Sequence, residues 1–126
     1  MVERKLDAHP VLLCQVQAVT DQSRNCARLA GLEPSKYENS ETTFDELKAR
    51  IAKSIAFLDT ITPEKTAGAE DRTIDVPLGA QTVPMKGIDY LQRLVVPNYF
   101  FHLTAAYTIL RHNGLEICKR DFLGMR

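Results

Sequence analysis

The segment 97–113 constrains the fold most, because the helix that it predicts is apolar on nearly every side. At about 100° per residue, one face carries Tyr99, Leu103, Ala106 and Leu110. The opposite face carries Phe101, Ala105, Thr108 and His112. Arg111 is the only full charge before the end of the segment, whereas a surface helix carries charges opposite its apolar stripe. The segment therefore predicts a helix that is either central in a bundle or covered by a second subunit.

Two further segments predict amphipathic helices. From residue 10 to residue 30, apolar or small residues recur at steps of three and four, and Gly31 follows as a left-handed stop. Thr43 and Glu46 then have the spacing of a capping box, ahead of an apolar stripe from Phe44 to Leu58. Lys48, Arg50 and Lys53 lie off this stripe. Both segments have the pattern of helices that bury one side in a core.

Between these helices and the last one, the hydrophobic period changes. In residues 74–85, apolar and polar residues alternate on both sides of a turn at 79–81, which predicts a short β-hairpin. Two prolines in the strands limit it to edge-like pairing. Helical spacing resumes near Gly87, and Pro97 predicts a break or kink before the last helix.

Length and composition indicate one globular domain. The chain has 126 residues, of which 44% are hydrophobic and 25% charged, values that are ordinary for a single domain. Its 16 basic and 16 acidic residues cancel, so no nucleic-acid partner is expected, because such binding needs a clustered basic excess. No apolar run reaches the roughly 20 residues of a membrane span, and the first residues do not resemble a secretory signal. We therefore expect a cytoplasmic protein without a membrane partner.

Several strings resemble one uncharacterised family. They are PNYFFHLTAAYTILRHNG at 97–114, KRDFLG at 119–124, CARLAG at 26–31, ETTF at 41–44 and GAEDR at 68–72. The family is domain of unknown function nineteen ninety-three, in the DinB/YfiT-like superfamily, and the resemblance spans residues 12–124. It implies an all-α, up-down helical bundle of three to four helices with a short β-hairpin insertion, formed as a single domain by residues 1–126.

The family resemblance is incomplete at the start of the chain. Members of the family generally carry one more long helix ahead of the matched region, whereas nine residues precede Pro10 here. A bundle without that helix exposes an apolar groove as large as a core, which monomers rarely tolerate. We therefore expect either a truncated chain or a homodimer that completes the bundle.

The resemblance is also incomplete in its histidines. Metal-binding members of the superfamily place three histidines at one end of the bundle, two of them four residues apart on the last helix. His112 resembles the second of that pair, but Thr108 stands four residues before it. His102 and His112 are ten residues apart and diverge by about 80° around the helix, so they cannot hold one ion together. No metal site is predicted, with His112 as a weak candidate ligand.

The candidate ligand-binding residues are Tyr99, His102, Tyr107 and His112. Each has a structural alternative. A buried tyrosine commonly sends its hydroxyl to the edge of a core, His102 lies beside the apolar stripe, and a histidine near a helix end interacts with the last carbonyls. His9 can cap the first helix, and Cys14 and Cys26 lie where packing is expected.

Nothing in the sequence assembles a nucleophile, a base and an orienting group, so whether this protein is an enzyme stays open. The leading hypothesis is an uncharacterised DinB-like helical bundle that forms a homodimer and binds a small molecule between its helices, without a cofactor. The alternative is a metal-dependent enzyme of the DinB type that catalyses thiol transfer or hydrolysis. In that enzyme, His112 would be one ligand of a divalent metal such as zinc or nickel.

Overall fold

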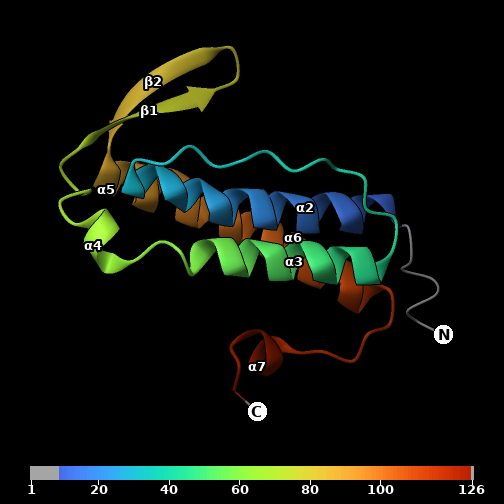
Figure 1. Ribbon diagram of the computed structural model, residues 1–126. Coiled ribbons are helices and arrows are strands. Elements are labelled where there is room, and N and C mark those ends of the chain that lie inside the picture. Colours follow the sequence, from blue (N-terminus) through green and yellow to red (C-terminus); the bar gives the residue numbers. More distant parts are fainter. Residues whose placement is uncertain (1–8, 126) are drawn as a thin grey trace.

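Three helical rods lie side by side in the computed structural model, which describes residues 9–125 (Figure 1). They are α2 (Pro10–Arg24), continued by the 3₁₀ helix η1 (Asn25–Ala30), then α3 (Phe44–Leu58), and α6 (Val96–His112). α2 packs against both α3 and α6, whereas the backbones of α3 and α6 approach each other closely at few positions. Phe44 of α3 packs on the cluster that contains Ala106 of α6. The helical bundle with a hairpin that the resemblance implies is confirmed.

The directions of the rods follow from the segment 31–43. This segment runs back along α2 after η1, so that α3 starts beside the start of α2 and runs in the same direction (Figure 1). Accordingly, Arg50 of α3 contacts Thr20 of α2. α6 runs the opposite way, and its residue Ala106 shares a buried cluster with Leu12 near the start of α2.

Side chains from residues next to or within the first turn cap the starts of α2 and α3. His9 Nδ1 accepts a hydrogen bond from the Leu12 N–H at 3.3 Å, which confirms the capping role of His9. Thr43 Oγ1 accepts from the Glu46 N–H at 3.3 Å. The Glu46 carboxylate accepts in return from the Thr43 N–H at 3.1 Å, so the predicted capping box is confirmed. Gly31 ends the first rod in the left-handed conformation, at φ 72°.

The predicted hairpin is also confirmed. β1 (Thr73–Leu78) and β2 (Gln81–Lys86) pair antiparallel, with Val76 opposite Val83. Ile74 and Val76 are buried in one cluster with Tyr90 and Val95. The hairpin is therefore attached to the bundle by one face, mainly through β1, with the partly buried Met85 of β2 beside it. The short helices are α4 (Pro63–Thr66), α5 (Gly87–Asp89) and α7 (Lys119–Phe122).

The predicted interruption at Pro97 takes the form of a π-helical turn and not of a break. α5, the π-helical turn η2 (Tyr90–Val95) and α6 follow one another as a single rod. A proline has no N–H and crowds the carbonyl four residues earlier, and the wider π turn before it accommodates this. Gly87 begins the rod where a Cβ atom would lie 1.8 Å from the Ala69 carbonyl oxygen, so only glycine permits this approach. No helix within residues 9–125 is long and apolar enough to cross a membrane.

Candidate functional site

An apolar groove of about 280 Å³ lies between α3 and α6, with α2 as its floor. It exists because α3 and α6 each pack on α2, while their backbones stay farther from each other. Its lining residues are Val16, Val19, Thr20 and Ser23 of α2, Ile51, Ser54, Ile55 and Leu58 of α3, and Tyr99, Leu103 and Ala106 of α6. No charged residue is among these described lining residues. The groove is therefore suited to an apolar occupant.

The hydroxyl groups of α2 and α3 in this groove are turned toward their own helices. Ser23 Oγ donates to the Thr20 carbonyl oxygen at 2.8 Å, and Ser54 Oγ donates to the Arg50 carbonyl oxygen at 2.9 Å. Thr20 Oγ1 likewise donates to a backbone carbonyl oxygen at 2.8 Å. Tyr99 also lines the groove, and its hydroxyl makes no hydrogen bond within residues 9–125.

The four predicted ligand-binding residues are not brought together. Tyr99 lines the groove. His102 lies on another side of α6, where its Nδ1 atom is 2.7 Å from a glutamine Oε1 atom of α2. The Tyr107 hydroxyl donates to a backbone carbonyl just before α7, and its ring contacts an aromatic ring of α7 at 5.3 Å between centroids. His112 is exposed as the last residue of α6.

The donor set that the metal-dependent alternative needs is not assembled in the described part of the chain. Between residues 9 and 125, no three His, Cys, Asp or Glu side chains lie close enough to hold a metal ion. The imidazole of His9 caps α2, and that of His102 faces α2. Burial raises the pKa of the Cys26 thiol above its ordinary value, which keeps it protonated and agrees with a packing role. His9, His102 and Cys26 therefore do not form a donor set that fits zinc or nickel.

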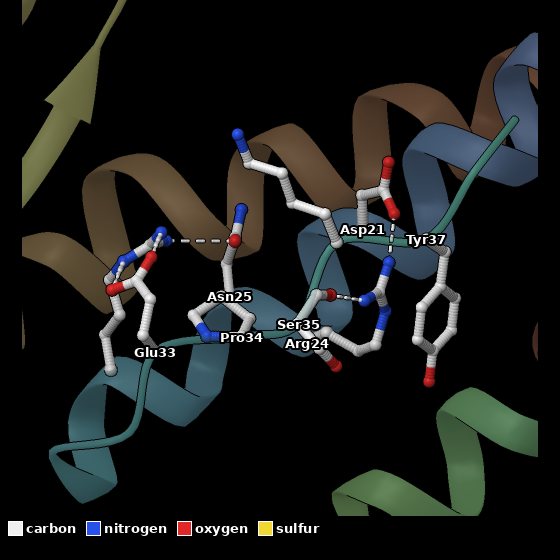
Figure 2. A pocket seen from close by; sticks show the side chains of 9 residues that line it. Asp21, Arg24, Asn25, Glu33, Pro34, Ser35 and Tyr37 are labelled. Atoms are coloured by element: carbon white, nitrogen blue, oxygen red, sulfur yellow. Dashed lines mark hydrogen bonds and ion pairs between the residues drawn. The ribbon is translucent and has the colours of Figure 1, made fainter.

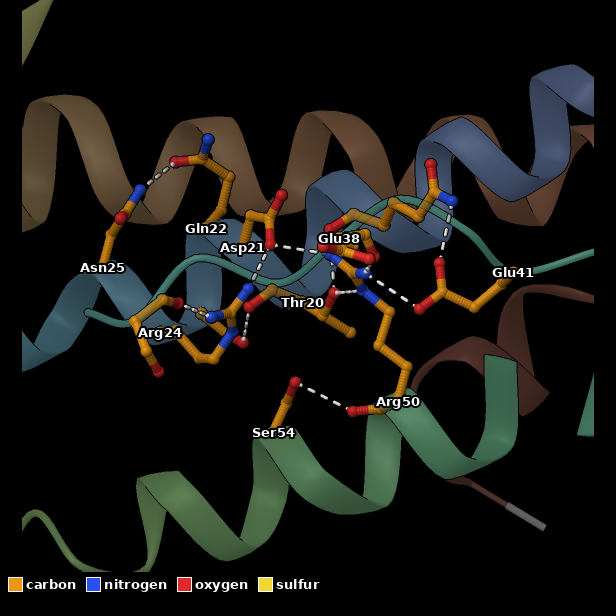
Figure 3. A network of polar contacts seen from close by, with 12 residues as sticks. Thr20, Asp21, Gln22, Arg24, Asn25, Glu38, Glu41, Arg50 and Ser54 are labelled. Carbon is orange, nitrogen blue, oxygen red and sulfur yellow. Dashed lines mark hydrogen bonds and ion pairs between the residues drawn. The ribbon is translucent and has the colours of Figure 1, made fainter. Parts of the chain in front are cut away.

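A buried ion-pair network joins α2, α3 and the segment 31–43 (Figure 3). Arg50 is 4% exposed, and its Nε atom donates to Thr20 Oγ1 at 2.7 Å. Its two terminal nitrogens donate to the Glu41 carboxylate at 3.0 Å and to the Asp21 carboxylate at 2.8 Å. A further bond of 2.9 Å goes to the Glu38 carbonyl oxygen. The guanidinium of Arg50 thus holds three segments of the chain at once.

The pKa of Glu41 reflects this network. Burial by itself favours the neutral carboxyl group, but hydrogen bonds from Arg50 and Gln17 outweigh it. The pKa of Glu41 therefore lies below its ordinary value of 4.5, so the carboxylate stays charged at neutral pH beside Arg50.

A second hollow of about 300 Å³ lies between the first rod and the segment 31–43 (Figure 2). It contains the buried Arg24 and the partly buried Arg28, and both make ion pairs. Arg24 donates to the Asp21 carboxylate and to a backbone carbonyl, and Arg28 donates to the Glu33 carboxylate. The Arg24 Cζ atom also lies 3.4 Å from the centre of the Tyr37 ring, a cation–π contact. These pairs fasten the segment 31–43 to the first rod, and they leave the Nε donor of Arg24 without a hydrogen-bond partner within residues 9–125.

The α3 wall of the groove lies outside the predicted set of ligand-binding residues. Ile51 and Ile55 belong to the predicted apolar stripe, but a stripe does not reveal whether its residues face a closed core or an open groove. Arg50 lies off the same stripe and is nevertheless buried, because the segment 31–43 covers that side of α3. The length of the segment 31–43 could have indicated that it covers part of α3, since a long irregular segment in a compact domain must lie along other elements.

The arrangement of three rods, a long crossing segment and a hairpin ahead of the last rod defines a DinB-like helical bundle. A crystal structure of a DinB family member protein from Shewanella denitrificans is similar, with a TM-score of 0.80 and 37% sequence identity. The match covers 90% of this chain and 65% of that chain.

The chain belongs to the family described as Domain of unknown function (DUF1993), whose model matches residues 6–123. It spans 65% of the length of the similar Shewanella protein. No curated protein matches it.

Proposed function

We propose that this protein is a homodimeric helical bundle that binds a small apolar molecule in the groove between α3 and α6. The observation that carries the proposal is the lining of the groove, which is uncharged and largely aliphatic over about 280 Å³. Ligand pockets commonly begin at about 300 Å³ and are mostly apolar with few polar groups. A ligand that covers Ile51, Ile55 and Leu103 removes apolar surface from water, which stabilises the complex by roughly 25 cal/mol per Å².

The hydroxyl groups of the groove restrict the chemistry of the ligand. The hydroxyls of Thr20, Ser23 and Ser54 already donate to backbone carbonyls of their own helices. A charged ligand would lose its hydration without gaining a partner there, which is costly. The Tyr99 hydroxyl remains for one polar group of the ligand. We therefore expect an uncharged molecule, apolar over most of its surface, with a single hydrogen-bonding group.

The test uses the fluorescent apolar probe N-phenyl-1-naphthylamine. Its emission should rise saturably with the wild-type protein. Ile55→Lys places a charge in the groove at a side chain that is already half exposed, so the fold should persist while probe affinity falls by about tenfold or more. Leu78→Lys is the matched control, because Leu78 is similarly exposed on the hairpin, outside the groove.

Two results would contradict the ligand site. One is a wild-type protein that gives no saturable signal with the probe. The other is equal probe affinity in Ile55→Lys and Leu78→Lys, which would place the probe somewhere other than the groove. Circular dichroism of both variants verifies that helix content is retained.

A further inference from the structure

We propose that the hollow between the first rod and the segment 31–43 binds a small anion that carries two oxyanion groups, such as a dicarboxylate or a diphosphate (Figure 2). Its volume of about 300 Å³ is the size at which ligand pockets commonly begin. No residue within 9–125 lines both this hollow and the apolar groove. The proposal therefore goes beyond the proposed function and does not depend on it.

The hollow contains a buried donor that has no acceptor. The side chain of Arg24 is 2% exposed. Its terminal nitrogens donate to the Asp21 carboxylate and to the Ser35 carbonyl oxygen, whereas its Nε atom has no hydrogen-bond partner within residues 9–125. Buried polar groups nearly always have a partner, because a bond left unmade costs free energy. An oxyanion beside Asp21 would supply the acceptor that Nε lacks.

The hollow also holds more positive than negative charge. The charged residues that line it are three cations and two carboxylates: Arg24, Arg28, Lys36, Asp21 and Glu33. Asp21 pairs with Arg50 as well, at 2.8 Å, so its single charge serves two guanidinium groups. Lys36 makes no ion pair within residues 9–125. This excess of positive charge favours an anionic occupant.

One of the two carboxylates is easily exchanged. The side chain of Arg28 is 12% exposed, whereas that of its partner Glu33 is 74% exposed. A carboxylate that stands in water and makes one ion pair is held weakly, so a ligand oxyanion can take its place on Arg28. Guanidinium groups bind carboxylates and phosphates through two parallel bonds, which a single-point pair does not use.

The spacing of the two arginines sets the size of the ligand. Arg24 and Arg28 are four residues apart in the first rod, and both line the hollow, so their side chains are neighbours on one face. One oxyanion group on each guanidinium makes an anion with two such groups the best match. The segment 31–43 has no helix or strand in its middle, and most of its side chains are exposed. It can therefore adjust around an occupant without disturbing the core.

The first test is calorimetric titration at low salt with pyrophosphate and with succinate. At least one of them should bind saturably, and acetate, which has a single oxyanion group, should bind about tenfold more weakly or worse. Tighter binding of pyrophosphate would assign phosphate chemistry to the site, and tighter binding of succinate would assign carboxylate chemistry. The absence of saturable binding by both would overturn the proposal.

Exposed residues at the hollow provide variants that should keep the fold. Glu33→Gln removes the built-in competitor and should raise affinity about fivefold, the usual upper value of an exposed ion pair. Glu38→Gln is the matched control, because Glu38 is exposed in the same segment and does not line the hollow. Equal affinities in these two variants would place the anion elsewhere and overturn the site.

A charge reversal tests the same site in the other direction. Lys36→Glu should lower the affinity about tenfold or more, because it sets a carboxylate against the ligand. Lys86→Glu, at the exposed end of β2, is the matched control and should bind as the wild type does. Equal affinities in Lys36→Glu and Lys86→Glu would contradict the proposal.

The donor of Arg24 has a readout of its own. In ¹H–¹⁵N spectra, its Nε–H signal is the one that disappears in Arg24→Lys, and it should shift when pyrophosphate or succinate saturates the protein. A signal that stays in place while the anion binds would overturn the role of Nε. The Glu33 and Lys36 variants do not depend on this assignment, so the site stays testable if Arg24→Lys loses helix content. Probe binding in the groove is measured separately and is not decided by any of these results.

Discussion

Arg50 shows how a single side chain can connect three parts of this fold. It lies beside the apolar stripe of α3, on the same buried side as Leu47 and Ser54. The segment 31–43 covers it there and supplies the Glu41 carboxylate and the Glu38 carbonyl oxygen. Removing one member of a buried, paired network leaves the other charges uncompensated, which destabilises by more than an exposed ion pair contributes.

At the scale of the residue, we expect Glu41 to make stability depend on pH. Since its pKa is lowered in the folded protein, its stabilising effect is fully present above the ordinary pKa of 4.5 and is lost as the pH falls through the lowered pKa. Glu41→Gln should reduce the free energy of unfolding by about 1–3 kcal/mol at pH 7. The difference from the wild type should shrink as the pH is lowered.

Urea denaturation at pH 7 and at a series of pH values below the ordinary carboxyl pKa measures both effects. Glu38→Gln is the control, because the side chain of Glu38 is exposed and only its backbone carbonyl joins the network. A constant difference between wild type and Glu41→Gln across the acid range would contradict the lowered pKa.

At the scale of the element, the sequence predicted the local features, which depend on residues close together in the chain. The capping box at Thr43 and the alternation of the hairpin both act within a few residues, and both were confirmed. The groove could not be predicted in this way, because it depends on how far α3 and α6 lie from each other. Pro97 was difficult for a related reason. A proline within a helix predicts an interruption from its own chemistry. Whether the interruption becomes a break or a π-helical turn depends on the whole rod.

The hairpin provides a prediction for an element held by one face. Val76 is 2% exposed in the cluster with Tyr90, whereas Val83 directly opposite is only partly buried. Val76→Ala should lower the free energy of unfolding by about 2 kcal/mol through lost burial and an unfilled cavity. Val83→Ala, the matched control on the partner strand, should have a clearly smaller effect. Equal losses in urea denaturation would mean that β2 contributes to the core as much as β1 does.

At the scale of the whole molecule, α2 is the shared partner of the other two rods. α3 is held mainly by α2 and the buried network, and its backbone comes close to α6 at few positions. Proteins open in cooperative units of different stability. We therefore expect the amides of α3 to exchange with deuterium at an opening free energy about 2 kcal/mol below that of α2 and α6.

Arg50→Met should accelerate exchange in α3 further and leave α6 unchanged, because the guanidinium of Arg50 bonds within residues 9–125 to α2 and the segment 31–43. Lys48→Met is the matched control, because Lys48 is exposed on the same helix and pairs only loosely with Asp45 at 3.7 Å. Identical opening free energies in all three rods would show that the bundle opens as one unit.

The opposite directions of α2 and α6 bear on how the chain folds as it is synthesised. α2 leaves the ribosome before α3 and α6, yet its most extensive contact is with α6. The bond between Gln15 and His102 joins residues 87 positions apart. Contacts at such sequence separations slow folding. The side of α2 that packs on α6 therefore stays exposed to water until α6 has been synthesised. During that interval, binding by a chaperone or early association with another nascent copy offers the most direct protection against aggregation.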